Sequence, residues 1–276
     1  MKTRIISAVV GVLLFVAILI LSTNLVLDTF YPIILTIAIA ALAAIATYEI
    51  LNNTKIVKNK LITVPAMIFS AGAVFMFSFE LDKQAILVYF VYVAILLTIS
   101  LFIHEKTSPI ELAAAQAYPL FLAFSFSCLD KLQREFGMFA FLLVFLFAWC
   151  SDTFAYFTGV FLGKHKLCPA LSPKKTVEGA IGGIVGCMLS IAVACLIEGI
   201  TFGDSAFWIL TLTSPIFSVL GMVGDISASY IKRHSGIKDY GNIMPGHGGV
   251  LDRFDSVLLI APVFYSLIYT LFIINI

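Results

Sequence analysis

The chain has 276 residues, a length that usually builds one or two soluble domains. Its composition excludes a soluble protein: 61% of the residues are hydrophobic and 12% are charged, against about 25% charged in a typical soluble domain. No fold of this size has enough interior to hide so much apolar surface from water. A soluble enzyme and a disordered chain are excluded, and the formal net charge of +1 argues against a nucleic-acid partner. The expected solvent is a lipid bilayer.

Runs of about 20 mainly apolar residues are long enough to cross a bilayer. They predict an all-α, polytopic integral membrane protein with about nine transmembrane helices in a single membrane domain over 1–276. Residues 1–130 would hold N-terminal helices without an assigned role, and residues 136–276 the catalytic helices and cytoplasmic loops. The first run is interpreted as a retained helix, because no signal-peptide cleavage motif follows it. The expected spans are 5–22, 29–51, 61–81, 85–104, 109–129, 136–163, 176–200, 206–231 and 251–274.

Positive charge is distributed unevenly among the segments that connect these spans. On this topology, 14 of the 17 lysines and arginines lie on one side of the membrane. Because cytoplasmic segments carry an excess of lysine and arginine, we expect a cytoplasmic N-terminus and an external C-terminus. The two long polar segments, 164–175 and 232–250, then face the cytoplasm. The chemistry is therefore expected at the cytoplasmic ends of the later helices.

Several carboxylates lie in or beside apolar segments, where an ionised group is costly and needs partners. Asp225 lies late in the eighth expected span, and Asp252 and Asp255 open the ninth. One helix would place Asp252 and Asp255 on the same face, and antiparallel packing would let Asp225 meet them. The three would repel one another without a cation, and oxygen ligands in a partly hydrated cleft favour Mg²⁺. The alternative is that Arg253 and the lysines pair with these acids.

The basic segment before the seventh expected span predicts a phosphate site. In LSPKKTVEG, Ser172 can cap a helix and Pro173 can take its first position. Lys174 and Lys175 would then lie in the first turn, where cations oppose the helix dipole. A bound anion would explain that arrangement. The alternative is an ordinary positive-inside anchor.

The glycine-rich segment MPGHGGVLDRFD precedes the ninth expected span. Gly248 and Gly249 would allow close backbone approach, and exposed N–H groups at the helix start would suit a phosphate. His247 is interpreted either as a phosphate donor or as an ordinary loop histidine.

Other features of the sequence predict structure. Small residues at i, i+3, i+4 and i+7 predict a face for close helix packing, within one chain or in a homodimer. The five cysteines form no CxxC pair and predict neither a disulfide framework nor a zinc site. Glu49 and Glu111 are isolated acids in apolar segments with no assigned role. The small-residue face consists of Gly179, Gly182, Gly183 and Gly186.

Three segments together resemble the phosphatidate cytidylyltransferase (CDP-diacylglycerol synthase) family. The longest reads S-Y-I-K-R-x4-K-D-Y-G-x3-P-G-H-G-G-V-L-D-R-F-D, from Ser229 to Asp255. The others are S-D-x2-A-Y-x2-G-x3-G, from Ser151 to Gly163, and S-P-K-K-T-x-E-G, from Ser172 to Gly179. The first half of the chain is similar to this family only in its apolar spans.

The resemblance implies an enzyme of phospholipid biosynthesis in a bacterial-type inner (plasma) membrane, with its active site facing the cytoplasm. It would convert CTP and phosphatidate into CDP-diacylglycerol and pyrophosphate, with Mg²⁺, two divalent ions or mixed cations. The catalytic set would be Asp225, Asp252, Asp255, Lys174 and Lys175, with the three aspartates as metal ligands. The substrate-binding set would be Asp152, Ser172, Lys232, Arg233, Lys238, His247, Gly248, Gly249 and Arg253. The role of Asp152, as a further ligand or as a group that orients a lysine, is left open.

Two other activities fit parts of this pattern. A CTP-dependent lipid kinase of the polyprenol type would use similar carboxylate and glycine motifs. An ion-coupled transporter would use Asp152 and Asp225 to carry cations, but the polar residues cluster on one side of the membrane.

Overall fold

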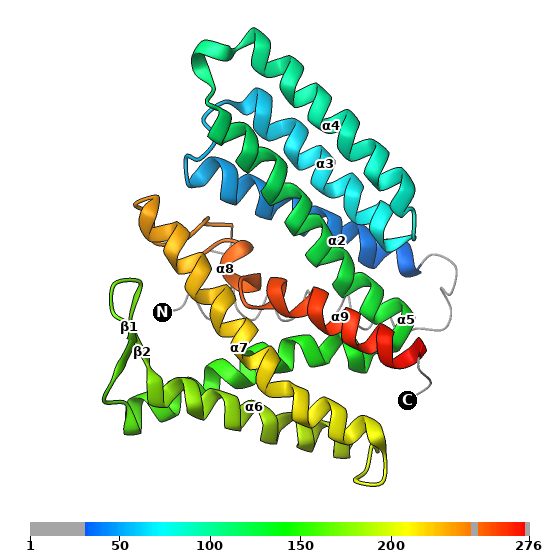
Figure 1. Ribbon diagram of the computed structural model, residues 1–276, viewed down its shortest axis with the longest axis vertical. Helices are drawn as coiled ribbons and strands as arrows, with labels where there is room; N and C mark the ends of the chain where they lie inside the picture. The colour runs from blue at the N-terminus through cyan, green and yellow to red at the C-terminus, as the bar shows by residue number, and fades with distance from the viewer. Residues whose placement is uncertain (1–30, 244–247, 274–276) are drawn as a thin grey trace. The chain divides into compact units, whose positions relative to one another are not determined.

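The computed structural model describes residues 31–243 and 248–273, and the expected first span and His247 lie outside them. Helices dominate the described chain (Figure 1), as the all-α prediction requires. The chain forms two compact units, each built from two segments. Unit 1 comprises Met1–Asp130 and His234–Phe254, and unit 2 comprises Lys131–Arg233 and Asp255–Ile276.

Unit 1 is a group of packed helices in which α2 lies against α3 and α3 against α4 (Figure 1). Small side chains on α2 and α3, such as Ala43 and Ala66, are fully buried, and small residues let helices approach closely. Its described elements are α2 Tyr31–Tyr48, the π-helix η2 Glu49–Asn53, α3 Lys60–Ser78, α4 Asp82–Phe102, the 3-10 helix η3 His104–Lys106, the first part of α5 Pro109–Leu162, and α8 Leu251–Phe254.

Unit 2 holds the rest of α5 and the helices that follow it. A two-stranded antiparallel hairpin leads into α6, with Lys166 opposite Thr176 (Figure 1). The elements are β1 Lys166–Cys168, β2 Ser172–Thr176, α6 Val177–Ile197, α7 Ser205–His234, which ends at the boundary with unit 1, and α9 Val257–Ile273.

The expected boundary between the fifth and sixth spans is in the wrong place. Residues 130–135 were expected as a loop but are helical, and the break between the fifth and sixth expected spans lies at Gly137, within α5. Element α5 therefore consists of two helices that meet at Gly137, in agreement with two expected spans. The helix changes direction at Gly137, whose φ of 84° and ψ of −179° are not helical.

The ninth expected span is also interrupted. A turn at Asp255 and Ser256 separates the four-residue α8 from α9. Asp252 and Asp255 therefore do not share one continuous helix, contrary to the expectation. Among the described residues, six helices are long and apolar enough to cross a membrane, so a polytopic membrane protein is confirmed but a count of nine is not.

The hairpin replaces the helix start predicted at Ser172. The helical conformation is unfavourable for a residue that directly precedes a proline, as Ser172 does. Proline itself is tolerated in a strand at the edge of a sheet. The sequence Ser172–Thr176 is accordingly extended, and α6 begins only at Val177. The cap is Thr176, whose Oγ1 accepts a hydrogen bond from the Gly179 N–H at 3.0 Å. Lys174 and Lys175 therefore lie on a strand and not in the first turn of a helix.

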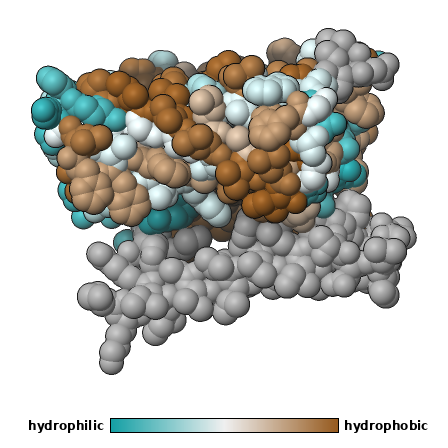
Figure 2. Space-filling model, turned by 90° about the horizontal axis from the view of Figure 1, so that it is seen from below, coloured by the Kyte–Doolittle hydropathy of each residue, from teal (hydrophilic) through white to brown (hydrophobic). Residues whose placement is uncertain are grey.

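Much of the coloured surface in Figure 2 is apolar, as expected for helices that face lipid. Helix α4 illustrates this, because few of its side chains are buried inside unit 1. Large exposed apolar residues on α4 are Ile86, Leu87, Phe90, Val91, Leu101 and Phe102.

The predicted glycine face packs α6 closely against α5 within unit 2, which confirms the packing prediction for a single chain. A Cβ on Gly179 would lie 2.8 Å from the carbonyl oxygen of Ala155. A Cβ on Gly183 would lie 2.8 Å from the carbonyl oxygen of Ser151. Only glycine allows this separation between the two helices.

Replacement of Gly183 by alanine should therefore destabilise unit 2. The added Cβ meets backbone, which cannot turn away as a side chain can, so overpacking should cost about 1–3 kcal/mol. Gly72→Ala on α3 is the matched control, because its Cβ would meet nothing within 4 Å. Thermal unfolding in detergent should show a lower Tm for Gly183→Ala and an equal or higher Tm for Gly72→Ala. Equal melting of the two variants would contradict the close packing.

Candidate active site

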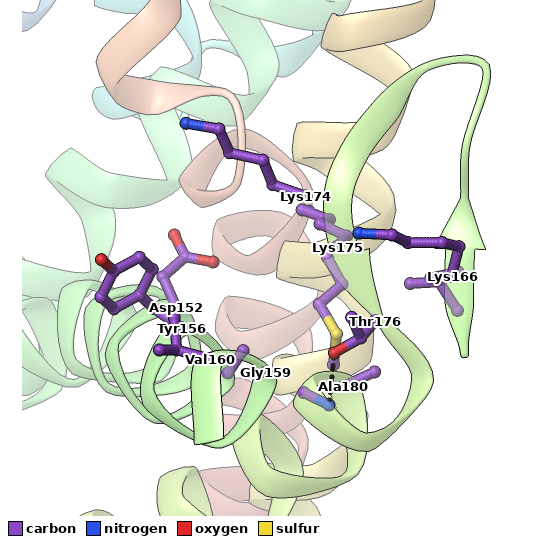
Figure 3. A pocket seen from close by; sticks show the side chains of 13 residues that line it. Asp152, Tyr156, Gly159, Val160, Lys166, Lys174, Lys175, Thr176 and Ala180 are labelled. Atoms are coloured by element: carbon purple, nitrogen blue, oxygen red, sulfur yellow. Dashed lines mark hydrogen bonds between the residues drawn. The ribbon is translucent and has the colours of Figure 1, made fainter. Parts of the chain in front are cut away.

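A cavity of about 450 Å³ opens in unit 2 between α5, the hairpin and α6. Figure 3 shows Asp152 and Tyr156 projecting from α5 on one side of it, and Lys166 projecting from β1 on the other. Lys174 and Lys175 on β2 also line it. Three lysines on a short hairpin give this cavity a cationic wall, which suits a phosphate-bearing ligand. Lys166 was not among the predicted site residues, and its position opposite Thr176 on β1 is the signal that places it there.

Lys175 forms an ion pair with Asp225 on α7. The Lys175 Nζ lies 2.5 Å from the Asp225 Oδ2, and the two side chains are 22% and 30% exposed. Lys175 is half-buried, whereas its neighbour Lys174 is exposed. An ion pair of this kind is what the alternative interpretation, in which lysines pair with the acids, expects for Asp225.

Three carboxylates of unit 2 interact electrostatically. We call these residues, Asp152, Asp225 and Asp255, the acidic cluster. Asp225 is close enough to repel both Asp152 and Asp255 electrostatically. Lys175 offsets the charge of Asp152, and Lys232 offsets that of Asp255. The carboxylates of the cluster therefore outnumber the lysines that offset them, and a further cation nearby would reduce their mutual repulsion.

Close backbone packing brings Asp255 to α7. A Cβ on Gly224 would overlap the carbonyl oxygen of Asp255, so α7 and the turn before α9 touch through backbone. The Asp255 carboxylate also accepts a hydrogen bond from the Ser256 N–H at 2.8 Å. Asp255 is thus held beside Asp225, the neighbour that the sequence predicted.

On the other side of the cluster, a hydrogen bond between buried hydroxyls fixes α5 against α7. The Ser151 and Ser218 Oγ atoms are 2.7 Å apart. Ser151 directly precedes Asp152, so this contact sets the position of Asp152 along α7.

The end of the glycine-rich segment, just before and at the start of α8, belongs to unit 1, and the N–H groups of residues 249–251 have protein partners. The Gly249 N–H donates to the Asp252 Oδ2 at 2.9 Å. The Val250 and Leu251 N–H groups donate to the two carboxylate oxygens of Glu49, at 3.0 and 2.8 Å. The expectation that these N–H groups are exposed for a phosphate is therefore wrong.

The structure distributes the predicted site residues between the two units. Asp252 belongs to unit 1, so the metal-binding trio of Asp225, Asp252 and Asp255 stays a prediction. Among the described residues, no group of three or more histidine, cysteine, aspartate and glutamate side chains is arranged to hold a metal ion. Unit 2 holds Asp152, Ser172, Lys174, Lys175, Asp225, Lys232, Arg233 and Asp255, and unit 1 holds Lys238, Gly248, Gly249, Asp252 and Arg253.

The sequence as a whole matches the model of the cytidylyltransferase family over residues 2–271. The chain belongs to this family. It is 35% identical over 273 residues to a phosphatidate cytidylyltransferase of Staphylococcus haemolyticus, an alignment that covers 95% of this chain and 96% of that one. Proteins of the same name from Staphylococcus saprophyticus and Staphylococcus aureus (strain COL) are 34% and 35% identical over 271 residues, with the same shares covered. The resemblance predicted from three motifs is confirmed.

The ion pair in this cytidylyltransferase-family chain can be tested by a double-mutant cycle. Lys175→Met and Asp225→Asn should each lower the Tm, since each leaves the other partner half-buried and without its counter-charge. The double variant should recover part of the loss, with a coupling energy of about 0.5–3 kcal/mol. The measurement is thermal unfolding without divalent cations. Strictly additive losses would show that the pair does not stabilise the fold.

Proposed function

We propose that this protein transfers the cytidylyl group of CTP to phosphatidate, with CDP-diacylglycerol and pyrophosphate as products. Its membership in the cytidylyltransferase family and the names of its relatives support this reaction. The observation that carries the site is the lysine-lined cavity beside the acidic cluster within one compact unit. The active site would face the cytoplasm, where CTP is available.

The reaction joins two anions, so charge is its main obstacle. An oxygen of the lipid phosphate attacks the α-phosphorus of CTP in line, and the bond from that phosphorus to the pyrophosphate oxygen breaks. The attacking phosphate is already ionised at neutral pH, so no strong general base is needed. Electron density ends on the departing pyrophosphate, which therefore needs positive charge around it.

The lysines of the hairpin supply that positive charge. Lys166 and Lys174 are exposed on the cavity wall and can contact the triphosphate directly. Lys175 forms an ion pair with Asp225, so a phosphate in contact with Lys175 would share the charge of this lysine with that carboxylate. Lys174 and Lys166 are therefore the stronger candidates for direct phosphate contact.

The acidic cluster offers carboxylate oxygens to a divalent cation, although its three carboxylates are not arranged around one metal position in the structure. Members of the family generally use a divalent metal. Carboxylate oxygens are hard ligands that suit Mg²⁺, and Asp225 and Asp255 lie close enough to interact electrostatically. A bound Mg²⁺ would neutralise phosphate oxygens and orient them for attack. Asp252, three residues before Asp255 in the chain, stays a predicted third ligand, and one or two ions remain alternatives.

The apolar surface of the helices fits a lipid substrate. The acyl chains of phosphatidate would remain in the bilayer while the phosphate reaches the cavity, which explains why an enzyme for a soluble nucleotide is built from membrane helices. A homodimer stays a prediction.

The direct test incubates purified protein with phosphatidate, Mg²⁺ and CTP labelled on the α-phosphate. We expect label in a CDP-lipid, with an equal amount of pyrophosphate released. Release of CDP with a phosphorylated lipid would instead identify a lipid kinase. Ion flux in proteoliposomes without nucleotide consumption would identify a transporter. Either result would overturn the proposal.

The lysines should differ in their effects on this reaction. Lys174→Ala should raise the KM for CTP about tenfold, which corresponds to about 1.4 kcal/mol for one charge-assisted phosphate contact. It should leave the Tm unchanged, because Lys174 is exposed on β2. Lys106→Ala in η3 is a matched control, since Lys106 is equally exposed but belongs to unit 1. A normal KM in Lys174→Ala would return this lysine to the role of a topology anchor.

The cation should bind through the acidic cluster. Asp255→Asn keeps the shape but removes a charged ligand, so it should abolish most activity and weaken the gain in Tm on addition of Mg²⁺. Removal of Mg²⁺ by a chelator should abolish activity of the unmodified protein. Asp204→Asn is the control, and Asp204 directly precedes α7. Hydrogen bonds from Thr201 hold the pKa of the Asp204 carboxyl below its usual range, so Asp204 is ionised. An equal Mg²⁺ shift in Asp255→Asn and the unmodified protein would remove Asp255 from the ligands.

A further inference from the structure

Glu49 is a fully buried carboxylate that no step of the proposed reaction uses. It begins the π-helix η2, where the chain leaves the regular geometry of α2. Its Oε1 accepts the Val250 N–H at 3.0 Å and its Oε2 accepts the Leu251 N–H at 2.8 Å. These contacts join residues about 200 positions apart in the chain. Glu49 therefore holds the start of α8 from within unit 1.

The glycines around Glu49 make room for its carboxylate. A Cβ on Gly241 or on Gly249 would overlap the Glu49 carboxylate oxygens. A Cβ on Gly248 would lie 2.8 Å from the Asp252 Oδ2, and its φ of 88° favours glycine in any case. Because these positions are glycines, the carboxylates of Glu49 and Asp252 can lie directly against the backbone.

Glu49 and Asp252 bind consecutive N–H groups of the same segment. Asp252 takes the Gly249 N–H at 2.9 Å and the Tyr240 N–H at 2.7 Å. Glu49 takes the next two N–H groups, those of Val250 and Leu251. Any movement of residues 249–251 therefore changes the contacts of both carboxylates at once.

The same network continues to the far end of η2. The Asn53 side chain donates to the Tyr240 carbonyl oxygen at 2.6 Å, while the Tyr240 N–H donates to Asp252. The tyrosine is 1% exposed, so its backbone is fixed in a packed environment. The π-helix η2 therefore makes two kinds of contact around Asp252. Glu49 accepts the N–H groups of Val250 and Leu251, and Asn53 donates to Tyr240, whose N–H donates to Asp252.

We propose that Glu49 is a positioning residue, which fixes the segment 249–251 and through it the orientation of the Asp252 carboxylate. The inference rests on the proposed function in one respect, the predicted role of Asp252 as a cation ligand. Both oxygens of Glu49 face N–H donors, so a charged carboxylate matches the site and an amide does not. In Glu49→Gln, the side-chain NH₂ group would face a backbone N–H, and one of the two contacts would be lost.

The experiment compares Glu49→Gln with Glu111→Gln, which alters a partly buried acid in the first turn of α5 in unit 1. Three quantities are measured: hydrogen exchange of the amides of residues 249–251, the Mg²⁺ concentration that gives half of the maximal rise in Tm, and the Mg²⁺ concentration that gives half-maximal turnover. For Glu49→Gln we expect exchange at least tenfold faster and both Mg²⁺ concentrations at least tenfold higher. For Glu111→Gln all three should match the unmodified protein.

A second variant covers the case in which Glu49→Gln fails to fold. Gly241→Ala displaces the Glu49 carboxylate by the overlap described above and leaves its charge in place. It should raise both Mg²⁺ concentrations in the same direction, whereas Gly72→Ala should not. Fast exchange with an unchanged Mg²⁺ dependence would show that Glu49 only stabilises the fold, and would overturn the proposal.

Failure of the proposed function gives a different result. The unmodified protein would then produce no CDP-lipid, yet the exchange and Mg²⁺-dependent melting measurements would still report on Glu49. Slow exchange of residues 249–251 in Glu49→Gln would overturn the inference whatever reaction the protein catalyses.

Discussion

The structure depends on how carboxylates are accommodated in a protein that is otherwise apolar. An ionised group removed from water is tolerated only when other groups stabilise its charge. Unit 1 does this with backbone, because Glu49 and Asp252 accept four N–H groups between them. Unit 2 does it with side chains, because Lys175 pairs with Asp225 and Lys232 offsets Asp255. The two solutions have different consequences: backbone partners fix a loop, whereas lysine partners can be shared with an incoming anion.

The site also depends on backbone contacts that only glycine permits. Gly224 lets α7 reach the turn at Asp255, and Gly183 lets α6 reach the backbone of α5 beside Asp152. These contacts set the spacing of the acidic cluster, so a side chain added at either position would move a carboxylate as well as a helix. Packing and chemistry are therefore coupled in unit 2, and substitutions in the glycine face are expected to affect stability and cation binding together.

Much of this organisation could be predicted from the sequence. Apolar runs gave the membrane class, the small-residue spacing gave the packing of α6, and Asp225 and Asp255 were correctly expected as neighbours. The errors have physical causes. A helix cap at Ser172 was inferred from local preference, but pairing with β1 satisfies the backbone of 172–176 instead and moves the cap to Thr176. The helix break at Asp255 and the continuous helix through 130–135 depend on tertiary packing, which apolar periodicity does not encode.

The role of Glu49 shows most clearly what local sequence cannot supply. An isolated acid in an apolar run has no visible partner, because its partners are backbone N–H groups about 200 residues away, and every residue type except proline carries that group. The glycine-rich segment was a signal in the sequence, but it was interpreted differently: Gly248 and Gly249 were expected beside a bound phosphate. In the structure, protein carboxylates lie against these two glycines, Asp252 at Gly248 and Glu49 at Gly249. Glycine-rich segments next to helix starts can thus accept an internal anion as well as an external one. Here protein carboxylates accept the N–H groups of residues 249–251, which leaves the hairpin lysines of unit 2 as better candidates, among the described residues, to receive the phosphates of a substrate.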